Sequence, residues 1–168
     1  MAYKKPVQGR AYPHLYNVTM TVGSRKALYK RENATLYTAS YAPNRRDDVM
    51  LVQYLLKRVN QGWILQGVPP TGAENLKIDG IHGPKTQKAI EDFQLELARG
   101  GRCIATDGCV DSEVGYDQYS DISKTGYTIS WLNSTFWRQN PALASDITKD
   151  PECPPELKQS VAAGDGSV

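Results

Sequence analysis

Apolar and polar residues alternate with a period of two in two short segments near the start of the chain, residues 16–22 (YNVTMTV) and 35–41 (TLYTASY). This alternation is typical of half-buried β-strands. Gly23-Ser24 ends the first segment, and Ala42-Pro43-Asn44 breaks the second. Two short strands are only marginally stable alone in water. We therefore expect them to pack on a sheet, on the rest of the chain or on another subunit.

Three later segments carry apolar residues at three- and four-residue spacing, which predicts amphipathic helices. The first begins at Asp47 or Asp48, whose side chain can cap it, and Gly62 can end it. The second begins at Gly83-Pro84, with proline at the first helical position, and stops at Gly100-Gly101. The third covers about residues 127–138. The predicted apolar faces comprise Val49, Val52, Leu55, Leu56 and Val59, then Thr86, Ala89, Ile90, Phe93 and Leu97, then Ile129, Leu132 and Phe136.

The charge is unevenly distributed, although the formal net charge of the 168 residues is only +2. Residues 1–46 contain nine Lys and Arg against one acidic residue, and residues 47–168 contain eleven against seventeen. Six of the ten tyrosines also lie in residues 1–41. This division predicts a basic, tyrosine-rich arm (residues 1–46) on an acidic body, and such an arm commonly has a binding partner. The alternative is a solvated tail.

Several classes of protein are disfavoured by composition. No apolar run approaches the roughly 20 residues that a membrane crossing needs, and residues 1–6 lack the apolar core of a secretory signal. His14 and His82 lie far apart, so we expect no metal site, no cofactor and no enzymatic activity. Cys103 and Cys109 can either close a disulfide loop or remain thiols, with Cys153 left over. Both alternatives stay open.

The body contains two Asp-Gly sequences that predict turns, one in residues 78–86 (IDGIHGPKT) and one in residues 105–111 (ATDGCVD). Glycine tolerates the positive φ that such turns need. The first turn leads directly into the second predicted helix, whereas a longer segment separates the second turn from the third helix. We interpret the following residues as structural: Asp79, Gly80, Gly83, Pro84, Thr86, Phe93, Gln94, Asp107 and Gly108.

With these motifs, residues 47–138 resemble the peptidoglycan-binding domain family, the three-helix modules often attached to bacterial and phage cell-wall hydrolases. The resemblance implies a mainly α fold: a three-helix domain over residues 47–140, with the strand arm 1–46 before it and an irregular, proline-containing tail 141–168 after it. A short helix over residues 155–162 of the tail is compatible with the pattern. The second turn departs from the family because no Gly-Pro-x-Thr follows it.

A glycan site needs aromatic rings together with amide or carboxylate side chains that match sugar hydroxyls. Each candidate for such a site can equally be a core or plain surface residue. The candidates are Gln53, Tyr54, Trp63, His82, Gln87 and Trp131.

The resemblance implies a non-catalytic peptidoglycan-binding-like protein. We expect it to be a structural or accessory subunit of a larger particle such as a phage virion or tail, made in the cytoplasm and docked to other subunits through the arm. One alternative is a free wall-binding protein that acts with a separate hydrolase. A less favoured alternative is nucleic-acid contact by the lysines and tyrosines of the arm.

Overall fold

The computed structural model describes residues 2–24, 42–114 and 125–163. Helices dominate these residues, which confirms the expectation of a mainly α protein. The elements in chain order are β1 (Tyr3–Pro6), β2 (His14–Asn17), β3 (Val22–Gly23), α1 (Arg46–Leu65), η1 (Ala73–Asn75), α2 (Pro84–Arg99), β4 (Cys109–Val110), α3 (Thr128–Gln139), α4 (Pro141–Ser145), η2 (Ile147–Lys149) and α5 (Pro155–Ala163).

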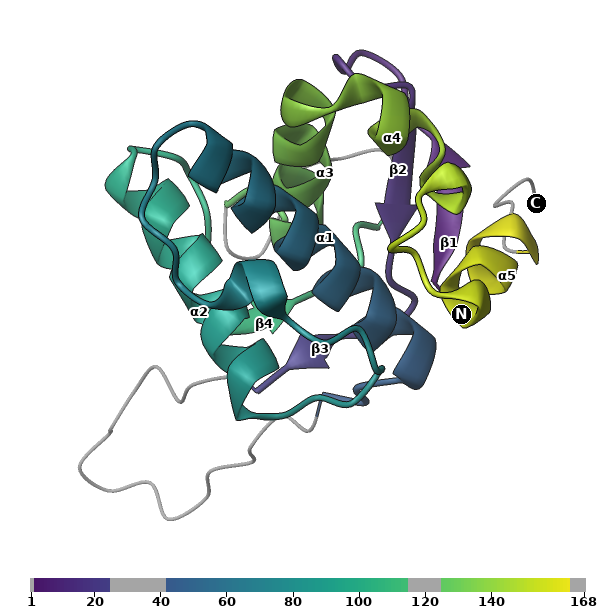
Figure 1. Cartoon of the computed structure of the whole chain (residues 1–168), viewed down its shortest axis with the longest axis horizontal. Coiled ribbons are helices and arrows are strands. Elements are labelled where there is room, and N and C mark those ends of the chain that lie inside the picture. Colours follow the sequence, from purple (N-terminus) through teal and green to yellow (C-terminus); the bar gives the residue numbers. More distant parts are fainter. Residues whose placement is uncertain (1, 25–41, 115–124, 164–168) are drawn as a thin grey trace.

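Helix α1 is the central element of the fold. It passes between α2 on one side and α3 and α5 on the other (Figure 1). The sequence predicts one apolar face for this helix, yet residues 48–56 are buried without interruption. A helix that is buried on all sides needs neighbours all around it. Elements from both ends of the chain supply them.

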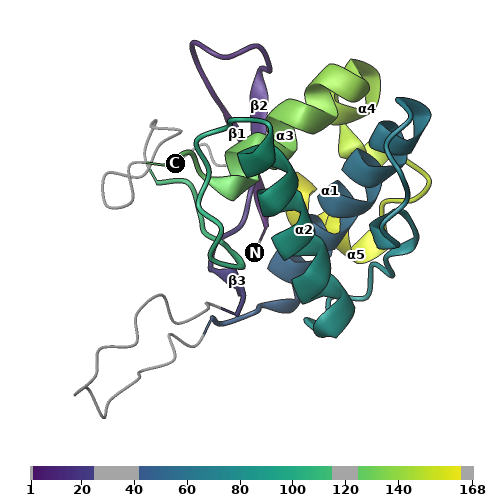
Figure 2. The ribbon, with the colours of Figure 1, turned by 90° about the vertical axis from the view of Figure 1, so that its left-hand side faces the viewer.

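The N-terminal residues 2–24 pack against this centre. β1 and β2 pair antiparallel, with Tyr3 opposite Asn17, and the ribbon lies beside α3 (Figure 2). Leu15, Tyr16 and Val18 are fully or almost fully buried. The segment expected to form one strand over residues 16–22 is instead divided between β2 and β3. The second expected strand, residues 35–41, lies outside the described residues.

The break between β2 and β3 has a physical cause on α1. The buried carboxylate of Asp48 accepts hydrogen bonds from the backbone N–H groups of Thr19 (2.9 Å) and Met20 (3.1 Å) and from the Thr19 hydroxyl (2.8 Å). Backbone donors that bond a side chain are not available to a strand ladder. Asp48, expected as a helix cap, therefore holds the N-terminal segment instead.

The ends of the helices follow the expected breakers with one exception. Helix α2 begins at Pro84 and is followed by Gly100, as expected, and α3 ends before Asn140. Gly62, however, does not end α1, which continues to Leu65. A Cβ atom at Gly62 would lie 2.4 Å from the Gln139 side chain. The glycine therefore allows α3 to approach closely.

The predicted division into arm, module and tail does not describe the core. One hydrophobic cluster draws on residues before α1, on α1 to α3 and on residues after α3. The expected irregular tail contains α4, η2 and α5, and its Ile147, Leu157 and Val161 are buried in that cluster. Residues 2–24 and 141–163 are parts of the body.

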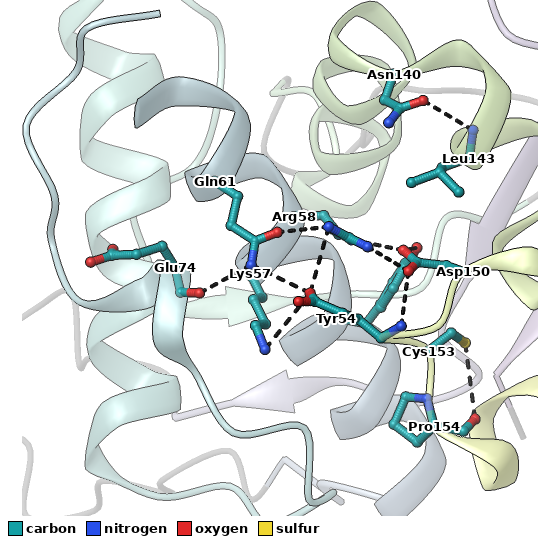
Figure 3. Close-up of polar contacts among 11 residues, drawn as sticks. Tyr54, Lys57, Arg58, Gln61, Glu74, Asn140, Leu143, Asp150, Cys153 and Pro154 are labelled. Carbon is teal, nitrogen blue, oxygen red and sulfur yellow. Dashed lines mark hydrogen bonds and ion pairs between the residues drawn. The ribbon is translucent and has the colours of Figure 1, made fainter. Parts of the chain in front are cut away.

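A polar network fastens the C-terminal residues to α1 (Figure 3). The fully buried carboxylate of Asp150 accepts hydrogen bonds from the Tyr54 hydroxyl (2.6 Å) and from Nε of Arg58 (2.7 Å), and it pairs with a second Arg58 nitrogen. Burial favours a higher pKa for Asp150, but the hydrogen bonds from Arg58, Tyr54 and the Glu152 amide outweigh it and hold the pKa below its usual value. The charged form of Asp150 thus stabilises the fold.

Replacing Asp150 with Asn should lower the free energy of unfolding at pH 7 by about 3 kcal/mol, because it leaves the Arg58 charge without its buried partner. A carboxyl group with a lowered folded-state pKa contributes stability above its unfolded pKa of about 3.9, and this contribution is lost as the pH falls through the folded-state pKa. Urea unfolding between pH 2 and pH 7 should therefore show a shallower acid limb for Asp150→Asn than for the natural chain.

The matched control is Glu152→Gln, since Glu152 lies at the exposed rim of the same network and forms longer contacts. Its effect should stay below about 1 kcal/mol. Parallel acid limbs for Asp150→Asn and the natural chain would contradict the role assigned to Asp150.

Removal of residues 1–44 gives a second test of the fold. The arm interpretation predicts that the remaining body stays helical and soluble. The structure leads us to expect the loss of a cooperative thermal transition, because the deletion uncovers α1 and α3. Circular dichroism melts measure the difference. A truncated chain that melts within about 5 °C of the full chain, equivalent to roughly 1–2 kcal/mol, would show that the N-terminal packing is dispensable.

Candidate functional site

Gln53 on α1, a candidate for glycan binding, forms its hydrogen bonds within the protein. It is buried, and its Oε1 accepts from the backbone N–H groups of Asp79 (3.1 Å) and Gly80 (2.9 Å). Its Nε2 donates to the Ile81 carbonyl (3.1 Å) and the Thr86 hydroxyl (3.0 Å). The amide thus fixes the first Asp-Gly turn and the start of α2 rather than a ligand.

Gln94 on α2 does the same for the second turn. Its Oε1 accepts from the N–H of Gly108 (2.8 Å), and its Nε2 donates to the carbonyl of Cys109 (2.9 Å) and the hydroxyl of Thr128 (3.0 Å). In each turn the aspartate carboxylate also accepts from the N–H two residues on, at Ile81 and Cys109, both at 3.0 Å. The structural role expected for the turn motifs therefore has an atomic basis.

Glycine is required in these turns. Gly80 has φ +73°, and a Cβ atom there would lie 2.8 Å from the carbonyl oxygen of Arg46. Gly108 has φ +75°, with the Ser24 carbonyl oxygen 2.9 Å from the position of a Cβ atom. Any side chain at either position is both strained and obstructed by backbone.

Three other candidates are also occupied by contacts within the protein. Tyr54 is fully buried against Asp150. Gln87 donates to the carbonyls of Gly108 (3.1 Å) and Ser24 (3.2 Å), and its Oε1 accepts from the Ser24 N–H. His82 lies with its Nε2 2.8 Å from the Gln87 Oε1. Gln87 thus links the residue after β3 and the second turn to α2.

Trp131 and Trp63 keep partial exposure, but they lie at different places. The indole N–H of Trp131 donates to the Cys103 carbonyl (3.3 Å), and the Arg102 guanidinium lies 5.7 Å from the ring centroid. Trp63 stacks on Phe93, with centroids 5.6 Å apart and planes at 19°. Trp63 lines a surface depression between α1 and α2.

This depression, which we name the α1–α2 groove, lies between the end of α1, the segment that follows it and the outer face of α2. It has two adjoining halves of about 250 Å³ each, which share Thr71, Lys88 and Asp92. Asn60, Trp63, Val68, Leu95, Glu96 and Arg99 complete one half, and Gly72, Ala73, Asn75, Leu76, Lys85 and Ala89 complete the other. Figure 1 shows the connecting segment as it returns along α1 toward the start of α2.

The groove combines a rigid floor with a polar rim. Trp63 has one face against Phe93, so a ligand can meet only its other face or its edge. Thr71 donates weakly to Asn60 (3.4 Å), which links the connecting segment to α1. Lys88 and Asp92, which line both halves of the groove, form an i,i+4 ion pair along α2. Leu95 is 43% exposed, although it is a large apolar side chain.

Sequence reasoning identified Trp63 but missed the remainder of the groove. Lys85, Lys88, Asp92, Leu95 and Arg99 recur at three- and four-residue spacing and form the face of α2 opposite its core face. Such a charged stripe is normally a solvated surface. The one signal that distinguishes it is Leu95, an apolar residue in a polar stripe.

Cys103, Cys109 and Cys153 are thiols and form no disulfide with one another; Cys103 is exposed, whereas Cys109 and Cys153 are buried. Burial raises the pKa of Cys153 to about 12, which keeps the thiol protonated and unreactive. Among the described residues, no group of three or more His, Cys, Asp or Glu side chains is placed to hold a metal ion.

Comparison of the chain with family models, with curated proteins and with solved structures finds no match. Within the described parts of the chain, none of the helices has the length and apolar character needed to cross a bilayer. The functional interpretation therefore depends on the α1–α2 groove itself.

Replacing Gln53 with Ala tests the structural role of this amide. The variant leaves the N–H groups of Asp79 and Gly80 without their acceptor, and each unsatisfied buried group costs about 1–3 kcal/mol. We expect chemical denaturation to show a loss of about 2–4 kcal/mol. Gln66→Ala, at an exposed residue beyond the same helix, should change stability by less than about 0.5 kcal/mol. Equal effects of the two substitutions would contradict the assignment.

Proposed function

We propose that the protein is a non-catalytic peptidoglycan-binding protein and that the α1–α2 groove is its binding site. The observation that carries the proposal is the position of Trp63, which stacks on Phe93 and lines the groove. Sugar rings pack their C–H faces on aromatic rings, and binding pockets typically combine such apolar contact with a few polar groups. Asn75 and Glu96 line the groove and carry polar groups that suit the hydroxyl and acetamido groups of a sugar.

The resemblance of residues 47–138 to peptidoglycan-binding modules supports the same ligand. The module of this proposal consists of α1, α2 and α3, and the two glutamine-held turns connect these helices in sequence. The motif residues act through backbone geometry, so they support the fold of the module; they are Asp79, Gly80, Thr86 and Gln94. The residues that line the groove support peptidoglycan as the ligand.

The expected role as a particle subunit stays a prediction. Docking was expected through residues 1–46, but residues 2–24 pack on the chain's own core. Four of the nine Lys and Arg residues of the arm fall in residues 25–41, which lie outside the described residues. Peptidoglycan binding through the groove is independent of that docking.

Co-sedimentation of the full chain with purified peptidoglycan sacculi tests the proposed function. Trp63→Ala should weaken binding about fivefold to tenfold, which corresponds to about 1–1.4 kcal/mol of lost contact. Leu95→Ser, at an exposed position of the same half, should weaken it about threefold without loss of fold. Trp131→Ala is the matched control on α3 and should leave binding unchanged.

Thermal melts of each variant separate a binding defect from a folding defect. Soluble muropeptides should compete with the sacculi. No sedimentation of the folded natural chain, or sedimentation that high salt abolishes completely, would contradict the proposal, since the second result indicates electrostatic adsorption alone.

A further inference from the structure

The two halves of the α1–α2 groove differ in chemistry. The half with Trp63 has an aromatic wall, Val68 and the exposed Leu95. The other half, which we name the alanine half, contains no aromatic residue, and its apolar lining is Ala73, Leu76 and Ala89. These three residues are at most 6% exposed, so each presents only a small apolar surface to the groove. This lining offers no aromatic face for a sugar ring, but it suits a small apolar group such as a methyl group.

The rim of the alanine half carries an excess of positive charge. Lys85 and Lys88 both line it, against the single acidic residue Asp92. Lys88 is paired with Asp92, whereas Lys85 forms no ion pair within the described parts of the chain. The Lys85 ammonium group thus lies beside an apolar floor without an ion-pair partner among the described residues. Such a group is suited to pair with the carboxylate of a ligand.

Lys85 also occupies an unfavourable position for helix stability. It lies in the first turn of α2, where the helix dipole favours acidic residues, and that turn contains none. The position therefore disfavours a lysine by local energetics. Departures from local preference concentrate at functional sites.

We propose that the alanine half binds the carboxyl-terminal alanine of a peptidoglycan stem peptide. This inference rests on the proposed function and divides the groove into two subsites. The alanine methyl group packs on Ala73, Leu76 and Ala89, and the terminal carboxylate meets the ammonium groups of Lys85 and Lys88. The sugar that bears the peptide lies toward Trp63, since the two halves adjoin at Thr71, Lys88 and Asp92.

Isothermal titration of the full chain with three probes tests the division. The probes are a synthetic stem pentapeptide that ends in D-Ala-D-Ala, the same peptide with an amidated C-terminus, and a soluble N-acetylglucosamine oligomer without peptide. We expect the free-acid peptide to bind about tenfold more tightly than the amide. Lys85→Gln should remove most of that difference and leave the affinity for the oligomer unchanged.

Lys77→Gln is the matched control, because Lys77 is exposed and does not line the groove. Trp63→Ala should produce the converse pattern, with weaker oligomer binding and an unchanged preference for the free acid. This pair of variants assigns each subsite separately.

The outcomes distinguish the inference from the function on which it rests. If sacculi and the oligomer bind but the acid and amide peptides bind equally, or if Lys85→Gln leaves the preference for the acid intact, the stem-peptide subsite is wrong and the wall-binding function stands. If neither sacculi nor any of the three probes binds the folded chain, the proposed function itself fails.

Discussion

The fold depends on side-chain amides that satisfy backbone groups of distant turns. Gln53 of α1 and Gln94 of α2 each hold an Asp-Gly turn and a threonine hydroxyl at the start of the next helix. On α3, Asn133 both accepts from the N–H of Tyr16 and donates to its carbonyl, each at 2.9 Å. Every one of these three amides is buried. Each of α1, α2 and α3 thus holds one other segment through a side-chain amide. Helices α1 and α2 hold the two Asp-Gly turns, and α3 holds the N-terminal segment.

These contacts explain why a small helical core tolerates so much irregular backbone. A buried turn must find partners for its N–H and C=O groups, and leaving one unpaired costs more than an average hydrogen bond contributes. Carboxamides carry a donor and an acceptor on one rigid group, so a single side chain serves both kinds of backbone group. The irregular segments that result are held firmly, and the connection from α1 to α2 can form one wall of the groove.

Local signals in the sequence were sufficient for the existence of α1, α2 and α3, but not for the end of α1, for α4 or for the environment of the helices. Pro84 sets the start of α2 because its ring fixes φ, and this effect needs no partner. The burial of α1 on all sides could not be predicted, because it depends on segments that are distant from α1 in the sequence. The same distance explains the error over residues 16–22: their alternation is real, but Asp48 takes the backbone donors of Thr19 and Met20.

The candidate site shows the same division between local and distant information. From the sequence, Gln53 is a candidate for a glycan contact as well as for a core role, because an amide suits a sugar hydroxyl and a backbone N–H equally well. The recurrence of Gln, Asp-Gly and Thr in one order, at Gln53 to Thr86 and again at Gln94 to Thr128, was the available signal for a structural role. Trp63 was identifiable from residue type, whereas the lysines opposite it had the pattern of an ordinary solvated face.

The location of the groove follows from how the chain covers its central helix. The N-terminal strands lie beside α3, and α5 lies along β1, so residues from both ends of the chain cover that side of α1. The far side is covered by α2 and the segment that joins α1 to α2. A connecting segment cannot fill the width of a helix, and the side chains of its residues 68–76 leave the depression that Trp63 and Lys85 line. The groove therefore forms on the side of α1 that a connecting segment covers, rather than on the side that helices and strands from both ends of the chain cover.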